Sequence, residues 1–318
     1  MAAFFGFHMP NYTYAGIPDD KLFDHVVAQA KAAEQAGFDM VTVMDHLYQI
    51  RGVGPETNAM LEAYTTLAAI ATQTSRVKVS TLVTGVTYRN PALLVKEVTT
   101  LDVISKGRAM LGIGAAWNED EHLGYGYDFP PIGRRMDRLE EAVQIARLMF
   151  TEERPTFEGK FFRIDRALNM PRPIQKGGPK IMIGGTGEQR TLRILAKYGD
   201  IGHWFGGPVE ELKRKKGVFE QHCEQVGRNP SDVLLTLGIG LILTESEEAG
   251  KAILERIPEV RRPMMRVATP DQAAEILRPY IDAGFGGFTF NNPAFPTVEA
   301  IGLAGELIQL VRGSGVAA

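Results

Sequence analysis

The feature that most constrains the fold is the alternation of short apolar runs with amphipathic stretches of helical length. Leu94, Val98 and Leu101, for example, share one helix face. Several of these stretches end on glycine just before the next apolar run, as at Gly37 and Gly284, and glycine supplies the left-handed residue that closes a helix. Repeated βα units with short connections predict a parallel sheet covered by helices. The predicted strands are AFFGFHM, MVTVM, VKVSTLV, AMLGIG, KIMIG, DIGHWF, LLTLGIGLIL and GFTFN.

Eight strands, each followed by a helix, in 318 residues predict a (β/α)8 barrel of the α/β class. The rival is an open doubly wound sheet, but no GxGxxG follows the first strand, where His8 to Asn11 stand instead. The long irregular segment Thr151 to Pro179 predicts a hairpin insertion that covers one end of the barrel, after the fourth strand and its helix. No linker is evident, so residues 1–318 are expected to form one domain.

The composition limits the classes of molecule that the protein is expected to bind. The net charge is −3, and the longest basic run, KRKK at Lys213 to Lys216, is typical of a solvated helix face, so nucleic acid is not expected. No basic leader or apolar stretch of membrane-spanning length is found. The single cysteine, Cys223, lies among polar residues and forms no internal disulfide. These features predict a cytoplasmic protein that acts on a small molecule.

Polar residues follow several predicted strands, at the end where barrel active sites are built. They are Asp45 and His46 after the second strand, His8 after the first, Thr84 after the third, Trp117 to His122 after the fourth, and His203 with Trp204 on the sixth. We favour a functional role for His46 over a structural one, and the reverse for His203. The NEDEH run matches no strong zinc spacing, so no metal is predicted; its acids either form an exposed loop or place Glu119 or Glu121 as a proton carrier.

The fifth strand runs directly into Gly184, Gly185, Thr186 and Gly187, and a helix follows. Glycines let the backbone approach an anion closely, and the free N–H groups at a helix start favour a phosphate. A tight turn that uses glycine only for its geometry is the alternative. We favour a phosphate site.

These stretches resemble the luciferase-like monooxygenase superfamily, and within it the actinobacterial oxidoreductases that use the deazaflavin coenzyme F420. The resemblance covers nearly the whole chain. It rests on VMDHL, on TLVTGVTYRNPALLVKEVTTLDVISKGRAMLGIGAAWNEDEHLGYG, on FPPIGRRMDRLEEAVQIARLMF and on KIMIGGTGEQRTLRILAKYGD.

The resemblance implies a barrel with a flavin or deazaflavin in its mouth, the ribityl phosphate near the GGTG turn, and a non-proline cis peptide at Leu82–Val83 behind the ring. The Asp-His pair of related enzymes maps onto Asp45 and His46, with Asp45 orienting His46. Some relatives place a glutamate acid soon after the glycine of the fourth strand, whereas Trp117 stands here, which leaves the proton donor open. The implied cofactor-binding residues are Leu82, Val83, Thr84, Ala115, Gly184, Gly185, Thr186 and Gly187; the substrate-binding ones are His8, Tyr48, Trp117, Glu121, His122 and Trp204.

The implied reaction is hydride transfer between F420 and a C=C, C=N or C=O substrate, or the reverse reaction with an alcohol. A flavin monooxygenase that uses FMN and oxygen is the second reading, because both cofactors share the ribityl phosphate. A non-catalytic flavin-binding barrel is the third. The substrate is not specified by the sequence, and relatives commonly form homodimers.

Overall fold

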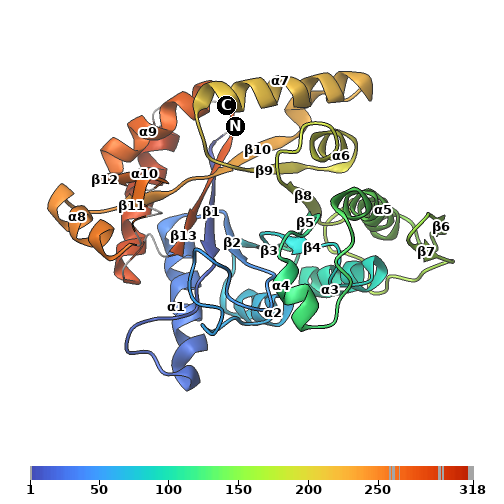
Figure 1. The fold of residues 1–318 in the computed structure, drawn as a ribbon, viewed down its shortest axis with the longest axis horizontal. Helices are drawn as coiled ribbons and strands as arrows, with labels where there is room; N and C mark the ends of the chain where they lie inside the picture. The colour runs from blue at the N-terminus through green and yellow to red at the C-terminus, as the bar shows by residue number, and fades with distance from the viewer. Residues whose placement is uncertain are drawn as a thin grey trace.

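The computed structural model describes residues 2–257, 259, 262–264, 266–292, 295 and 297–313. Within these residues a nine-stranded parallel sheet has the order β3-β2-β1-β13-β10-β9-β8-β5-β4. A parallel bridge between Val79 and Ala109 joins its two ends, and Figure 1 shows the sheet wrapped around a central axis. The strands are β1 (Phe4–Met9), β2 (Met40–Val43), β3 (Lys78–Thr81), β4 (Thr84–Gly85), β5 (Met110–Gly114), β8 (Lys180–Gly184), β9 (Ile201–Phe205), β10 (Leu234–Gly238) and β13 (Gly287–Asn291).

β3 and β4 are two halves of one strand, because β3 pairs with β2 and β4 pairs with β5. Between them lies the Leu82–Val83 peptide, which is cis as predicted. Counting the two halves as one strand gives the eight-stranded barrel order, so the (β/α)8 prediction is confirmed.

The helices cover the outside of the barrel (Figure 1). The Glu62 side chain caps α2 by accepting from the N–H groups of Tyr64 and Thr65, and Asn90 caps α3. Gly37 closes α1 with φ of 96°, the left-handed role expected from the sequence. The helices are α1 (Asp19–Ala36), α2 (Ala63–Gln73), α3 (Pro91–Ile104), α4 (Glu119–Gly124), α5 (Ile132–Thr151), α6 (Thr191–Tyr198), α7 (Val209–Gln225), α8 (Glu247–Arg256), α9 (Pro270–Asp282) and α10 (Gly302–Gly313), with short 3-10 turns at Pro230–Asp232, Arg262–Met264 and Glu299–Ile301.

Side chains point alternately outward and inward along each strand, and they form two separate hydrophobic cores. Outward side chains such as Phe5, Phe7 and Trp204 are fully buried against the helix layer. Inward side chains at the amino-terminal end of the barrel form a second, smaller cluster of Met40, Met110, Met182 and Ile201. Toward the carboxyl ends, three strands carry glycine at inward positions: Gly112 and Gly114 of β5, Gly184 of β8 and Gly238 of β10, with β9 between β8 and β10. The barrel is therefore filled at its base and open at its mouth.

The predicted strand LLTLGIGLIL is two strands. β10 ends at Gly238, and β11 (Leu241–Leu243) pairs with β12 (Arg266–Ala268) in a separate parallel sheet beside α8. Figure 1 shows this small sheet at the edge of the molecule. The Gly-Ile-Gly sequence at 238–240 lets the chain leave the barrel, so one continuous apolar run serves two sheets.

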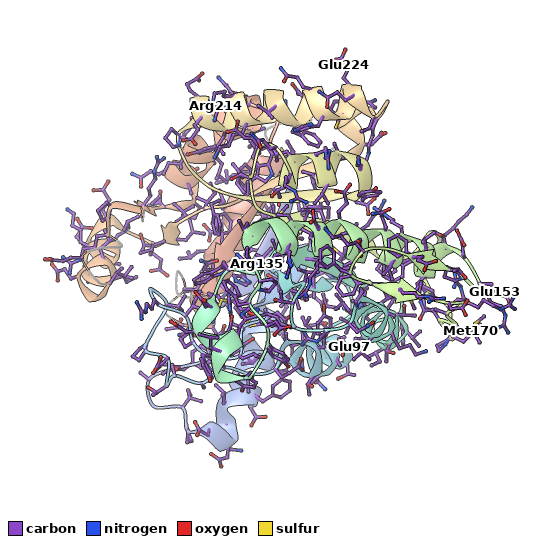
Figure 2. All side chains as sticks on the ribbon, turned by 45° about the vertical axis from the view of Figure 1, so that its right-hand side comes forward. Glu97, Arg135, Glu153, Met170, Arg214 and Glu224 are labelled. Atoms are coloured by element: carbon purple, nitrogen blue, oxygen red, sulfur yellow. The ribbon has the colours of Figure 1, made fainter. Side chains whose placement is uncertain are left out.

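The predicted hairpin follows α5 in the sequence, as expected, but it does not cover an end of the barrel as predicted. β6 (Phe157–Glu158) and β7 (Arg163–Ile164) pair antiparallel outside α5, and Figure 2 shows Glu153 and Met170 of this segment at the rim of the molecule rather than over the barrel. The Glu141 side chain on α5 accepts from the backbone N–H groups of residues 160–162. These three hydrogen bonds hold the hairpin to the helix layer.

Candidate active site

The end of β2 and the short helix α4 meet at the mouth of the barrel through His46 and Glu121. His46 Nδ1 lies 2.7 Å from Glu121 Oε1, and the Leu47 N–H donates to Glu121 Oε2 at 2.7 Å. The Tyr88 hydroxyl donates to the same carboxylate. Glu121 is fully buried. Burial opposes ionisation, but the hydrogen bonds from His46, Tyr88 and Leu47 outweigh it and hold the pKa of Glu121 below its usual value.

These contacts fix the tautomer of His46. An ionised carboxylate only accepts hydrogen bonds, so His46 Nδ1 carries a proton and donates to Glu121. His46 Nε2 then has no protein partner within the described residues, and the ring stands edge-on to Trp117 with centroids 5.4 Å apart. The Trp117 side chain is 59% exposed. A proton-accepting nitrogen therefore stands at the mouth beside an exposed aromatic ring.

Asp45 does not orient His46, contrary to expectation. Its carboxylate makes a two-point ion pair with Arg89, at 2.6 and 3.1 Å. Arg89 also binds Glu62 at 2.8 Å and Glu97 at 3.1 Å; Glu97 lies on α3 and is labelled in Figure 2. Burial raises the pKa of Asp45, and the Arg89 guanidinium opposes that shift. Asp45 thus ties β2 to the start of α3, whereas Glu121 orients the histidine.

Thr84, expected to contact the cofactor, supports the third strand instead. Its buried hydroxyl bonds to Tyr64 Oη at 2.8 Å and to Thr81 Oγ1 at 2.9 Å, and Thr81 donates to the Gly112 carbonyl at 3.0 Å. The hydroxyls of Tyr64, Thr84 and Thr81 are thus all hydrogen-bonded within the wall of the barrel. The Thr84 hydroxyl is therefore held within the wall of the barrel.

Leu82 and Val83 lie on the inner side of the barrel, as their inclusion in the small interior cluster indicates. A Cβ on Gly114 would come within 3.0 Å of Val83 Cγ2, and one on Gly184 within 2.7 Å. Val83 therefore packs directly on the backbone of β5 and β8, which only glycine allows at these two positions. The three residues form a flat apolar wall on one side of the mouth.

The GGTG turn begins as β8 ends. Gly185 has φ of 112°, and its N–H donates to the His203 carbonyl at 3.0 Å. The amides of Thr186 and Gly187 make no hydrogen bond within the described part of the chain. The sequence predicted a helix directly after Gly187. In the structure a turn at residues 188–190 comes first, and α6 follows it. The unpaired amides are suited to bind an anion.

Two predicted substrate residues are buried in the wall instead of facing the mouth. His122 is fully buried, with Nδ1 2.5 Å from the Asn118 carbonyl and Nε2 2.6 Å from Thr87 Oγ1, so both ring nitrogens are occupied. Trp204 faces outward and packs edge-on to Phe285 with centroids 5.4 Å apart. The two-residue period of a strand explains the second error, because His203 takes the inward position and its neighbour must point away.

Three other predicted residues, Tyr48, Ala115 and His8, take no part in the network that holds His46 and Glu121. Tyr48 packs against Tyr125 with ring centroids 5.5 Å apart. Ala115 follows β5, and its carbonyl accepts from Arg135 Nε at 3.1 Å; Arg135 lies on α5 and is labelled in Figure 2. His8 faces the barrel interior and bonds to Thr42. Sequence reasoning did not single out Arg89 and favoured a structural reading of His203. Strand alternation places the His203 side chain inside the barrel.

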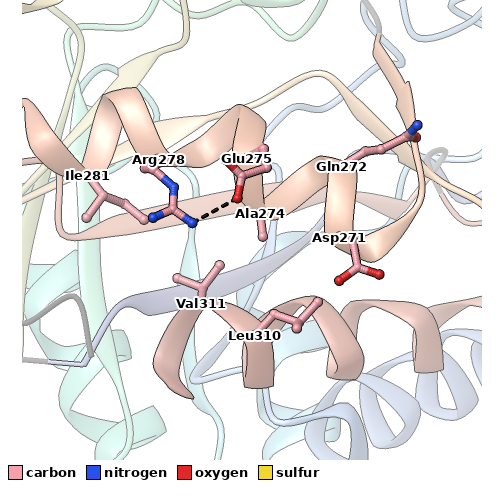
Figure 3. Close-up of a pocket in the computed structure, with 8 residues that line it drawn as sticks. All are labelled: Asp271, Gln272, Ala274, Glu275, Arg278, Ile281, Leu310 and Val311. Carbon is pink, nitrogen blue, oxygen red and sulfur yellow. Dashed lines mark hydrogen bonds and ion pairs between the residues drawn. The ribbon is translucent and has the colours of Figure 1, made fainter. Parts of the chain in front are cut away.

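The groove in Figure 3 lies elsewhere, in the helix layer between α9 and α10. Arg278 and Glu275, both on α9, pair along one side of it at 2.8 Å. Among the described residues, no group of three or more His, Cys, Asp or Glu side chains could hold a metal ion. No helix in the described ranges is long and apolar enough to cross a membrane.

The model of the luciferase-like monooxygenase family matches residues 2–279. The chain belongs to this family.

Among curated relatives of this luciferase-like protein are enzymes named F420-dependent glucose-6-phosphate dehydrogenase. The one from Amycolatopsis mediterranei is 26% identical over 303 residues, covering 84% of this chain and 88% of that protein. The one from Nakamurella multipartita is 29% identical over 311 residues, covering 88% and 89%. Homologues named for F420 thus align with most of this luciferase-like chain.

Solved structures agree on the fold. An F420-dependent secondary alcohol dehydrogenase, in complex with an F420-acetone adduct, has a TM-score of 0.80 at 21% identity and covers 98% of this chain and 100% of its own. A long-chain alkane monooxygenase has a TM-score of 0.80 at 15% identity, covering 99% and 92%. The luciferase-like barrel therefore matches both a dehydrogenase and a monooxygenase in shape.

Proposed function

We propose that the protein is an F420-dependent oxidoreductase that transfers a hydride between the deazaflavin and a small organic substrate. The observation that carries this proposal is the His46–Glu121 pair, a histidine held by a buried carboxylate at 2.7 Å beside a glycine-floored mouth. The homologues named for F420, at 26 and 29% identity over most of the chain, support the choice of cofactor.

The residues present fit a cofactor with a flat ring and a phosphate. Val83 packs on Gly114 and Gly184, where a Cβ would collide with it, and these residues offer an apolar wall to a flat ring. The free amides of Thr186 and Gly187 follow on the next turn and would hold the phosphate. When bound, the deazaflavin would supply the hydride chemistry.

His46 would handle the proton that accompanies the hydride. Glu121 keeps the Nδ1 proton in place, so Nε2 is free to accept a proton from an alcohol or, once protonated, to return one to a carbonyl. The buried carboxylate also stabilises the protonated ring electrostatically. Trp117, edge-on to His46, would wall the substrate side and help to exclude water.

A flavin monooxygenase that uses FMN is the second candidate, favoured by the shape match to an alkane monooxygenase. The two are distinguished by titrating the purified protein with F420 and with FMN and following cofactor fluorescence. Micromolar or tighter F420 binding with much weaker FMN binding supports the proposal. Tight FMN binding alone supports the monooxygenase, and binding of neither cofactor contradicts both. Loss of turnover in His46→Ala, with F420 binding retained, would then support the proton-transfer role.

A further inference from the structure

A second histidine pair lies inside the barrel, below the mouth and apart from His46. His203 alternates with the outward-facing Trp204 on β9, so its ring points into the barrel. His8 occupies the same kind of position on β1. Neither takes part in the network that holds His46, and the proposed mechanism uses neither.

The hydrogen bonds of Thr236 fix the tautomer of His203. Thr236 Oγ1 lies 3.1 Å from the Gly202 carbonyl, which can only accept, so the single hydroxyl proton is donated there. The same oxygen lies 2.9 Å from His203 Nδ1 and must accept from it. His203 therefore carries its proton on Nδ1, and Nε2 is an acceptor with no partner among the described residues.

His203 Nε2 points toward the mouth. A Cβ built on Gly238 would lie 3.3 Å from this nitrogen, and Gly238 is two residues nearer the carboxyl end of β10 than Thr236. On the other side, Gly184 is the register partner of His203 on β8. Because both flanking positions are glycine, neither β8 nor β10 places a side chain of its own beside His203 Nε2 there.

His8 repeats this arrangement. Its Nδ1 lies 2.9 Å from Thr42 Oγ1, and Thr42 Oγ1 lies 3.5 Å from the Phe7 carbonyl. Burial, reinforced by the neighbouring His203, lowers the pKa of His8 to about 3, and burial lowers the pKa of His203 to about 4. Both rings are therefore neutral at physiological pH.

We infer that His203 and His8 bind a hydrogen-bond donor of a ligand in the barrel mouth, an O–H or N–H group, through their unprotonated Nε2 atoms. The lone pair on each nitrogen attracts a donor and repels a carboxylate or carbonyl oxygen. Within the proposed function, on which this inference rests, the donor is either a substrate hydroxyl or the ring N–H of the cofactor.

The test compares His203→Leu, which removes the acceptor at similar volume, with His203→Gln, whose amide oxygen can replace it. Gly238→Ala places a methyl group where the donor would approach, and Gly217→Ala, whose added Cβ meets nothing within 4 Å on α7, is the control. Dissociation constants are measured for F420 on each protein, and for cyclohexanol on each F420-loaded protein. Thermal melting confirms that each variant is folded.

Loss of the hydrogen bond is expected to weaken binding about tenfold in His203→Leu and Gly238→Ala, with recovery in His203→Gln and no change in Gly217→Ala. Weaker F420 binding identifies the cofactor N–H as the donor, and weaker cyclohexanol binding with unchanged F420 binding identifies a hydroxyl. Unchanged binding of both ligands in His203→Leu overturns the inference. If the wild-type protein binds FMN and not F420, the proposed function fails, and the same variants are compared with FMN, whose ring carries the same N–H group. If it binds neither cofactor, both ideas fail.

Discussion

Glu121 is the residue whose role depends most on its neighbours. On an exposed loop it would be one acid among three, but here it is fully buried and receives hydrogen bonds from His46, Leu47 and Tyr88. Its carboxylate is engaged by these three groups, so it acts through His46. We regard it as a positioning residue.

Substitution of Glu121 by Gln is expected to lower kcat about 10- to 100-fold with little change in KM, because the neutral amide no longer stabilises protonated His46. Steady-state kinetics across pH, with Asp120→Asn on the exposed face of α4 as the control, provide the measurement. A purely structural role would instead lower melting temperature and leave the pH profile of kcat unchanged.

The buried histidines predict a loss of stability in mild acid. The pKa of His203 is about 4 in the fold and about 6.5 in an unfolded chain, so between these values the unfolded state binds the extra proton. The free energy of unfolding should therefore fall as the pH drops below about 6.5, by roughly 1–2 kcal/mol at pH 5 from this group. Urea titrations at pH 7 and pH 5 measure the loss, which should be smaller in His203→Gln. An equal loss in both proteins would contradict this assignment.

At the scale of elements, the Asp45–Arg89 pair joins the end of β2 to the segment between β4 and α3. Both side chains are largely buried, and Arg89 also forms ion pairs with Glu62 and Glu97. Three elements distant in sequence are thus connected through one guanidinium.

Removing the carboxylate in Asp45→Asn should cost about 3 kcal/mol, because it weakens the compensation of a buried guanidinium. Chemical denaturation measures the cost, and Asp24→Asn, which breaks only an exposed pair on α1, should change stability by less than about 1 kcal/mol. Turnover per folded molecule should decrease little in Asp45→Asn. A large loss of kcat in a fully folded variant would show that Asp45 contributes directly to catalysis.

At the scale of the whole molecule, the hairpin is an appendage of α5. The Ala167 N–H donates to the Pro155 carbonyl at 3.1 Å, so its two ends already meet. Replacing residues 156–166 by Gly-Ser-Gly should therefore leave F420 affinity within about twofold and lower the melting temperature by a few degrees, since Ile164 leaves the core. Calorimetry and fluorescence titration of the shortened chain test this. A tenfold loss of affinity would show that the hairpin contributes to the mouth.

The strands and helices of the barrel and the glycine turn were predictable from the sequence, because each has a local signature in period, propensity or glycine spacing. The cis peptide at Leu82–Val83 was predicted from the family resemblance alone. The prediction of a single strand at residues 234–243 was wrong, because an apolar run does not reveal which of two sheets it joins. The error at Trp204 was avoidable, since alternation along β9 makes His203 and Trp204 face opposite sides.

Local patterns in the chain determined the barrel, because apolar period and helix-closing glycines act between residues near in sequence. Pairings between distant residues were decided only by the tertiary structure. Asp45 and His46 are adjacent, yet Arg89 takes one and Glu121 the other, over separations of 44 and 75 residues. The reason is geometric: adjacent side chains at a strand end diverge, and which partner each meets depends on how the barrel closes around them.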